Sequence, residues 1–203
     1  MEAEVTARAS SLRAVTFIAA MLKMFFINFA PGCSTPSELL KKLNKEYCEV
    51  VRTGEYVTAF YAIFDPKKGR VSYSGAGHPP VFLHHVRDGR IERLQSDGFF
   101  IGMYGDADYA DRVAGFEAGD RCLFYTDGII EAYSERRKEQ FGGDRLFRSF
   151  RLHAGEPIET MVRSIIAGVK RFMGKSRFLD DLAIVAVEYA DESEHDKKSA
   201  REG

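Results

Sequence analysis

The sequence has few cysteines, and their spacing excludes two classes of small stapled domain. Cys33, Cys48 and Cys122 are odd in number, lie far apart and never form a CxxC pair. They therefore do not provide the framework of a disulfide-stabilised or zinc-stabilised fold. We interpret them as reduced thiols of a cytoplasmic protein.

The sequence also lacks a large net charge, a long apolar run and a basic leader. Its formal net charge of −1 creates no field that would favour nucleic acid or a membrane surface. The most apolar run, residues 17–29, is interrupted by Lys23 and Asn28 and is shorter than the ~20 apolar residues that a membrane-spanning helix needs. The first four residues are acidic rather than basic, unlike a signal peptide. We expect a cytoplasmic protein with no nucleic-acid partner and no membrane span.

What is present fits one soluble domain of mixed secondary structure. The 203 residues are 45% hydrophobic and 29% charged, which is enough for one substantial core. No repeat or linker interrupts residues 1–190, so we expect one domain there. Residues 191–203 are charged and lack large apolar side chains, which predicts a disordered tail.

Helix signals lie at both ends of the chain. Residues 10–30 are apolar on more than one face, which predicts a largely buried helix. The segment "TPSELLKKL" then offers Thr35 as N-cap, Pro36 at the first helical position and Glu38 to complete a capping box. Two later helices are expected near residues 143–152 and 158–173, the second ending at Gly174.

Between these helices the apolar period changes to that of strands. The pattern predicts three hairpins and a final strand. The expected strands are "YVTAFYAIF" with "RVSYSG", "PVFLHHV" with "RIERL", residues 110–116 with 121–125, and "LAIVAVEY" at 182–189.

Carboxylates lie at the ends of two of these strands. Asp127 follows the strand that ends at Tyr125, and Asp180 and Asp181 precede the strand that starts at Leu182. If the two strands are antiparallel neighbours, the three carboxylates converge on one edge of a sheet. Clustered hard oxygen ligands favour Mg²⁺ or Mn²⁺. The alternative is that each Asp only forms a turn or caps a strand.

Four segments in this order resemble a known family. "TAFYAIFDPKKGRVSYSGAGHPPVFLH", "LFYTDGIIEA", "FGGDRLF" and "FLDDLAIVAVEY" are similar to the SpoIIE/RsbU-type branch of the bacterial metal-dependent (PPM, type 2C) serine/threonine phosphatases. The resemblance extends from about Tyr56 to Tyr189. The combination of AGHPP, YTDGxxE and DD before a terminal strand is more specific than any one of these motifs.

The resemblance implies a fold, a cofactor and a reaction. The fold would be α+β, a four-layer αββα sandwich of two antiparallel sheets flanked by helices. Two Mn²⁺ or Mg²⁺ ions would lie at one edge, and a metal-activated water would attack the phosphorus of a phosphoserine or phosphothreonine. By motif position Asp127 and Asp180 would be metal ligands, Asp181 a further or neighbouring carboxylate, and Gly128 a small residue that permits close packing.

The motif "GAGHPP" contains a histidine that could act as a general acid. The alternative, which we favour, is that Gly77 and its neighbouring glycine and prolines shape a tight connection in which His78 packs or forms hydrogen bonds. Gly77 and His78 are thus expected to support the site rather than to react.

The sequence departs from the family at its first motif, Asp-Val-x-Gly-His-Gly, whose Asp bridges both metals. The nearest local match runs from Glu4 to Ala9, so that Glu4 would replace the Asp and alanines would replace both glycines. There is also no room for the strands that usually precede this motif. The domain is therefore expected to be N-terminally truncated or divergent, with exposed sheet edges that a second copy of the chain could pair with to form a homodimer.

Two functions follow from these observations. The first is a metal-dependent phosphoserine/phosphothreonine phosphatase of bacterial partner switching, whose partner by resemblance is a phosphorylated anti-anti-sigma-type regulatory protein. The second is a pseudophosphatase that keeps the fold and binds a regulatory partner without chemistry. Asp127 and Asp180 favour the enzyme, and the altered first motif favours the binding protein.

Overall fold

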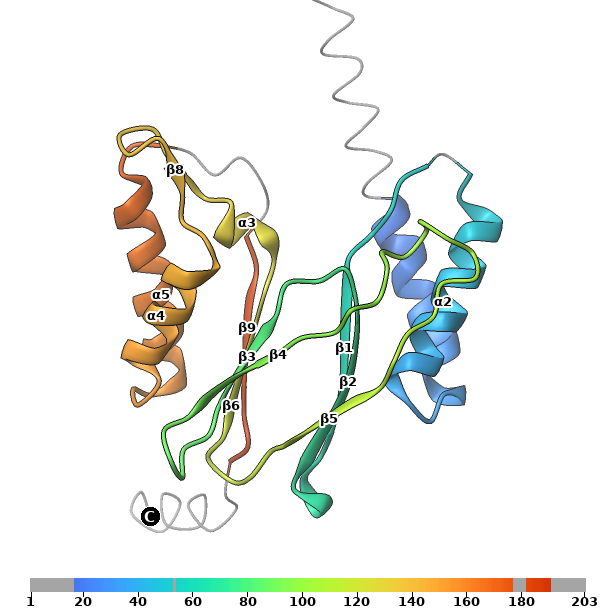
Figure 1. Ribbon diagram of the computed structural model, residues 1–203, viewed down its shortest axis with the longest axis horizontal. Helices are drawn as coiled ribbons and strands as arrows, with labels where there is room; N and C mark the ends of the chain where they lie inside the picture. Colours follow the sequence, from blue (N-terminus) through green and yellow to red (C-terminus); the bar gives the residue numbers. More distant parts are fainter. Residues whose placement is uncertain (1–16, 53, 177–181, 191–203) are drawn as a thin grey trace, which may run out of the picture. The chain divides into compact units, whose positions relative to one another are not determined.

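The computed structural model describes residues 17–52, 54–176 and 182–190. They fall into two compact units that interleave along the sequence. The first unit contains residues up to 63 together with 72–78 and 96–113, and the second contains 64–71, 79–95 and the rest of the chain from 114. Figure 1 labels the elements of both units, which are described separately below.

The first unit contains two consecutive helices, which a short turn separates, and the second of them has a well-formed N-cap. Residues 17–29 are helical and continue into the 3-10 turn η1 (Ala30–Gly32). Helix α2 (Pro36–Val50) begins as predicted: the Thr35 side chain accepts a hydrogen bond from the Glu38 N–H, at 3.3 Å. The Glu38 carboxylate accepts from the N–H of Ser34 rather than from that of the cap residue itself, at 2.9 Å. Pro31 and Gly32 thus lie where the first helix ends, and Thr35 with Pro36 marks where α2 begins.

The prediction that the helix before Gly32 is largely buried is wrong. Within residues 17–29 no side chain is buried, and Phe17 is 70% exposed. Apolar residues on more than one face of this helix remain partly in solvent, and one side packs against the α2 core around Leu39 and Tyr47.

The first sheet contains three strands in the order β1-β2-β5. Strands β1 (Ala59–Asp65) and β2 (Arg70–Ala76) are joined by the turn η2 (Pro66–Lys68) and by Gly69, which has a left-handed backbone. Strand β5 (Arg112–Gly115) pairs in this sheet. The predicted pairing of residues 110–116 with 121–125 is therefore wrong. The "EAGD" turn carries the chain from this sheet to the next, because its Asp120 accepts hydrogen bonds from the N–H of Glu117 within the turn and from the N–H of Val86 instead of closing a hairpin.

The second unit contains an antiparallel sheet of four strands in the order β4-β3-β6-β9. These strands are β3 (Val81–His84), β4 (Ile91–Leu94), β6 (Arg121–Tyr125) and β9 (Ile184–Glu188). Strand β6 lies in the interior of the sheet and is bonded on both sides. Its apolar character, read from the sequence, is that of a strand buried between neighbours.

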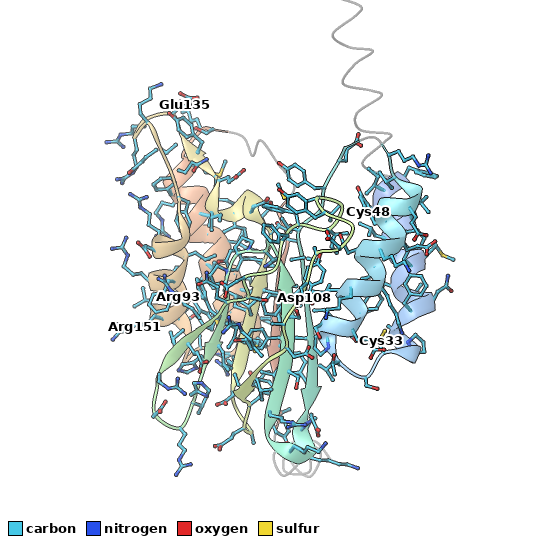
Figure 2. The ribbon with its side chains drawn as sticks, turned by 45° about the vertical axis from the view of Figure 1, so that its right-hand side comes forward. Cys33, Cys48, Arg93, Asp108, Glu135 and Arg151 are labelled. Carbon is cyan, nitrogen blue, oxygen red and sulfur yellow. The ribbon has the colours of Figure 1, made fainter. Side chains whose placement is uncertain are left out.

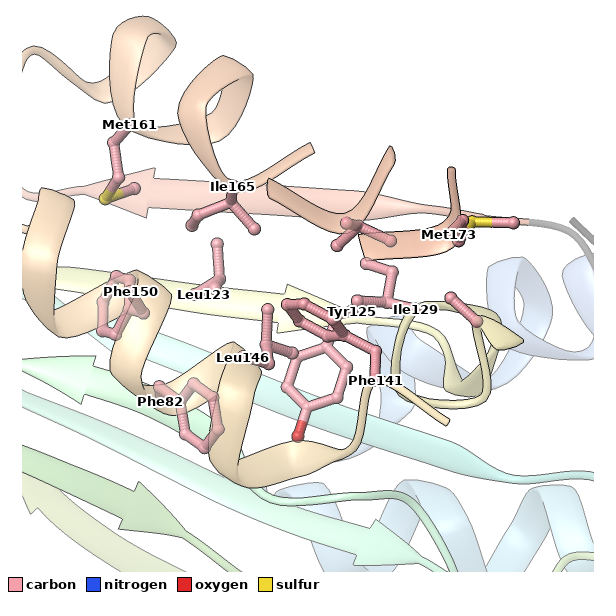
Figure 3. Packing of buried hydrophobic residues seen from close by; sticks show 12 residues of the cluster. Phe82, Leu123, Tyr125, Ile129, Phe141, Leu146, Phe150, Met161, Ile165 and Met173 are labelled. Carbon is pink, nitrogen blue, oxygen red and sulfur yellow. The ribbon is translucent and has the colours of Figure 1, made fainter. Parts of the chain in front are cut away.

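Helices cover one face of this sheet. They are α3 (Asp127–Ile130), α4 (Gly143–His153) and α5 (Ile158–Met173), with the short strands β7 (Tyr133–Ser134) and β8 (Glu139–Gln140) between α3 and α4. Figure 3 shows how Leu123 of β6 faces Ile165 of α5 across a core that also holds Phe82 and Phe150. Helix α5 ends at Gly174, which has φ +68°, as the sequence predicted.

The architecture is α+β, as expected from the sequence. In the described part of the chain no helix is both long enough and apolar enough to cross a membrane. The expected tail, residues 191–203, lies outside the described residues.

Candidate metal centre

The end of strand β6 is held by the start of strand β9. Tyr125 pairs with Ile184 in antiparallel register. The pairing continues one step further, because the Thr126 N–H donates to the Ala183 carbonyl at 3.1 Å and the Ala183 N–H donates to the Thr126 hydroxyl at 2.9 Å. The antiparallel pairing on which the predicted convergence of carboxylates depends is therefore present up to the residue before Asp127.

Asp127 stands at the point where the chain leaves the sheet. It is the first residue of α3 and is half-buried. Its Oδ1 accepts one hydrogen bond, from the N–H of Gly128 at 3.0 Å, and among the described residues it forms no ion pair. A carboxylate can accept about four hydrogen bonds, so most of its capacity is open to a ligand. Gly128 is buried at this turn, which agrees with the packing role expected of it.

The other predicted ligands belong to two further segments of the chain. Asp180 and Asp181 fall within residues 177–181, and Glu4 within residues 1–16, both outside the described residues. Among the residues that the structure does describe, no group of three histidine, cysteine or acidic side chains could hold a metal ion. The ligand set of Asp127, Asp180, Asp181 and Glu4 thus stays a prediction.

The "GAGHPP" segment has the geometry of a tight connection. Gly77 has φ +63°, and its N–H donates to the Gly98 carbonyl at 2.8 Å. A Cβ on Gly77 would collide with the ring of Phe100. The ring of His78 packs against that of Phe60, with centroids 5.7 Å apart. These contacts favour the structural interpretation of the motif, and the supporting role of Gly77 and His78 stays a prediction.

A second carboxylate, which was not singled out from the sequence, lies at the opposite end of β6. Asp120 is only 2% exposed and accepts from the N–H groups of Val86, at 3.0 Å, and Glu117, at 2.9 Å. Its Oδ2 also lies 3.2 Å from Nδ1 of His85. The one signal in the sequence was the Gly-Asp turn before an apolar strand, which also occurs in turns without such a network.

Comparison with known proteins identifies the family. The family model described as "Stage II sporulation protein E (SpoIIE)" matches residues 11–190, and the chain belongs to this family. A relative, phosphoserine phosphatase RsbU of Bacillus subtilis, is 32% identical over 100 residues, which are 49% of this chain and 30% of that protein. The chain spans between 20% and 37% of the length of the three curated relatives that it matches.

Solved structures show the same fold. The SiaA PP2C domain of Pseudomonas aeruginosa has a TM-score of 0.72 at 18% identity, over 84% of this chain and 66% of that one. The catalytic domain of the serine/threonine protein phosphatase PstP, solved with two manganese ions, has a TM-score of 0.59 at 13% identity, over 85% of this chain and 82% of that one. The fold is that of PP2C phosphatase domains, as the sequence motifs implied.

Proposed function

We propose that this chain is a metal-dependent phosphoserine/phosphothreonine protein phosphatase of bacterial partner-switching signalling. The observation that carries the proposal is the antiparallel pairing of β6 with β9. It brings Asp127 to the same end of the sheet as Leu182, the residue that directly follows Asp180 and Asp181 in sequence. This pairing supports the convergence of carboxylates that the family motifs imply.

The part of the site that the structure describes fits a hard divalent cation. Asp127 offers carboxylate oxygens with open capacity, and oxygen is the donor that Mn²⁺ and Mg²⁺ prefer. We propose that Asp127 and Asp180 hold the metal, with Asp181 beside them and Glu4 in the place of the family's bridging Asp. Bound there, the metal ions would lower the pKa of water and so supply the nucleophile for phosphate-ester hydrolysis.

The protein's own residues position this site. The hydrogen bonds of Thr126 with Ala183 fix the end of β6 against β9, and the buried Gly128 lets the chain turn into α3 directly after Asp127. The substrate we propose is a phosphorylated anti-anti-sigma-type regulatory protein in the cytoplasm. We further propose that residues 1–190 form the phosphatase domain, that residues 191–203 are its tail, and that exposed sheet edges permit a homodimer.

A pseudophosphatase is the second candidate function. One observation favours it: the first family motif is replaced by the residues from Glu4 to Ala9. In that case the domain would bind a regulatory protein without hydrolysing it.

Hydrolysis of p-nitrophenyl phosphate with Mn²⁺ separates the two candidates. We expect metal-dependent turnover in the wild type and a loss of at least about 100-fold in Asp127→Asn and in Asp180→Asn, because even residues that only orient metal ligands change affinity or activity by about 10–100-fold. The matched control is Asp106→Asn, an exposed carboxylate of the first unit, which should retain wild-type turnover.

A calorimetric titration with Mn²⁺ reports on the site without turnover. Binding that is lost in Asp127→Asn but kept in Asp106→Asn supports the metal site even if turnover is low. A folded wild type that neither turns over nor binds Mn²⁺ contradicts the phosphatase and supports the pseudophosphatase.

A further inference from the structure

A cavity of about 510 Å³ lies in the second unit, and Asp127 is not among its lining residues. It is formed by the β7–β8 hairpin and the C-terminal end of α5. Its lining consists of residues 134–137 and 171–176. Figure 2 shows Glu135 near the tip of this hairpin.

A hydrogen bond and stacked side chains hold the walls of the cavity together. The Ser176 hydroxyl accepts from the Glu135 N–H at 3.2 Å, which ties the hairpin to the end of α5. The Phe172 ring lies on the apolar side of the cavity, with the guanidinium groups of Arg137 and Arg145 5.6 Å and 4.9 Å from its centroid. Arg145 donates to Gln140, Phe141 and Glu139 and so holds the Phe172 side of the hairpin, whereas Arg137 lines the cavity and its N–H groups remain able to donate.

Most of the charged residues that line the cavity are basic. Arg136, Arg171 and Lys175 are exposed and form no ion pair with any residue that the structure describes. Among the described lining residues one is acidic, Glu135, and it is paired with Lys138 at 2.9 Å. A concave surface with several uncompensated cations concentrates anionic groups. Because the whole chain has a net charge of −1, this basic surface is a local feature and not a consequence of composition.

The cavity adjoins the candidate metal centre along the chain on both sides. The hairpin starts after α3, and the N–H of Gly142 returns to the Ile130 carbonyl of α3 at 2.8 Å. The other wall, ending at Ser176, leads directly into the segment that contains Asp180 and Asp181. In Figure 1 the β7–β8 hairpin and α3 lie at the same end of the second unit.

We propose that this cavity binds an acidic segment of the phosphorylated protein substrate, beside the phosphoresidue. The inference rests on the proposed function, and it adds a selectivity for substrates with Asp or Glu near the phosphorylated residue. Carboxylates of that segment accept hydrogen bonds from Arg136, Arg171 and Lys175, and its apolar atoms contact Phe172. A single cavity with four cations that form no ion pair with a described residue, Arg137 included, suits a short acidic segment better than an extended polyanion, whose binding needs many phosphate contacts.

The test uses two fluorescein-labelled phosphoserine peptides of equal length, one flanked by Glu and one by Gln. Binding is measured by fluorescence anisotropy in EDTA, so that no turnover is needed. The cavity variant carries Arg136→Gln, Arg171→Gln and Lys175→Gln. The control variant carries Lys67→Gln, Arg70→Gln and Arg87→Gln, three exposed basic residues of the same unit, and has the same net charge.

We expect the Glu-flanked peptide to bind more tightly than the Gln-flanked one. The cavity variant should weaken binding of the Glu-flanked peptide about 10-fold, as is typical when a few partly exposed charge contacts are lost. The control variant should change it less than about 2-fold. In the presence of Mn²⁺, kcat/KM for the Glu-flanked peptide should fall in parallel, while turnover of p-nitrophenyl phosphate stays unchanged.

Three outcomes would overturn the proposal: equal binding of both peptides, equal losses in the cavity and control variants, or a cavity-dependent affinity that is greater for anionic lipid vesicles or single-stranded DNA than for the Glu-flanked peptide. Cavity-dependent binding in a protein without turnover would support the docking site and contradict the phosphatase. Normal turnover, together with peptide binding that does not depend on the cavity residues, would support the phosphatase and contradict the docking site.

Discussion

The two ends of strand β6 carry the same residue type in opposite states. Asp120, which directly precedes the strand, is 2% exposed and accepts from two backbone N–H groups as well as facing His85. Asp127, which lies just beyond its other end, is half-buried, and among the described residues it accepts only from the neighbouring Gly128.

The difference shows how to separate structural from functional carboxylates in this fold. A buried carboxylate whose acceptor capacity is used by backbone donors contributes to stability, and its removal leaves those donors unpaired. A carboxylate with open capacity at a strand end contributes little to folding and is available for a cation. Variants at the two ends should therefore separate stability from metal binding.

The largest effect on stability is expected at the Asp120 end. Asp120→Ala removes the acceptor of the Val86 and Glu117 N–H groups, so the free energy of unfolding should fall by about 3 kcal/mol. Urea denaturation measures this change. Asp106→Ala, at an exposed position, should stay within about 0.5 kcal/mol of the wild type. A loss as small as that control would show that the Asp120 network is not structural.

A somewhat smaller effect is expected for Arg121, the first residue of β6. Its Nη1 donates to the Ala154 and Glu156 carbonyls at 2.6 Å and 2.5 Å, and its Nε donates to Glu188 at 2.8 Å. Arg121→Met keeps the apolar stem and removes these donors, and should cost about 2 kcal/mol in urea denaturation. Arg112→Met, which breaks one exposed ion pair with Asp97, is the control and should cost no more than about 0.5 kcal/mol.

A pH-dependent effect is expected at His84, which pairs with Arg121 across β3 and β6. Burial, and then the positive charge of Arg121, lower the pKa of His84, and its Nδ1 is buried without a hydrogen-bond partner among the described residues. The nearby Asp120 and Asp88 act in the opposite direction and are weaker. The folded protein therefore binds fewer protons here than the unfolded chain.

The sign of the effect follows from this difference. Above the unfolded pKa of about 6.5, His84 is neutral in both states and does not reduce the free energy of unfolding. As the pH falls from there towards the lowered folded pKa, the unfolded chain takes up the proton first, and the free energy of unfolding decreases. The free energy of unfolding, measured between pH 7.5 and 5.5, should fall less in His84→Gln than in the wild type. One proton accounts for at most about 1.4 kcal/mol per pH unit. Parallel curves for both proteins would show that His84 is not the group involved.

The smallest effect on stability is expected at Asp127. Asp127→Asn should leave the free energy of unfolding within about 0.5 kcal/mol, because one hydrogen bond to the next residue is all that it makes among the described residues. Mn²⁺ should raise the Tm of the wild type but not that of this variant, since a ligand stabilises only the state that binds it. A loss of stability near that of Asp120→Ala would make Asp127 a capping residue rather than a ligand.

Local signals in the sequence predicted most of the secondary structure. The Thr35 cap, the left-handed Gly174 and the apolar residues of β6 depend on neighbours in the sequence, and each element forms where its signal lies. Pairing between strands was less predictable. The strand at Arg112–Gly115 joins β2 instead of β6, because the direction of the chain after Phe116 is set by the contacts of Asp120 with residues more than 30 positions away.

For the functional sites, too, the sequence predicted what depends on neighbouring residues and not what depends on packing. Asp127 could be singled out because a strand, a carboxylate and a glycine follow one another in a motif. The basic cavity could not, because Arg136 and Arg171 come together only when the hairpin packs against the end of α5. Helical and strand periodicity within each segment carries no information about that contact.

The pairing of β6 with β9 also has a consequence for synthesis on the ribosome. Asp127 is made long before Ile184, and β9 is the strand against which the end of β6 is fixed. At elongation rates of about 5–20 residues per second, a nascent chain carries the first carboxylate for several seconds without the strand that follows the other two. The metal site that we propose would therefore be completed only when the last strand of the sheet emerges, so a growing chain would have no complete metal site to load or to use.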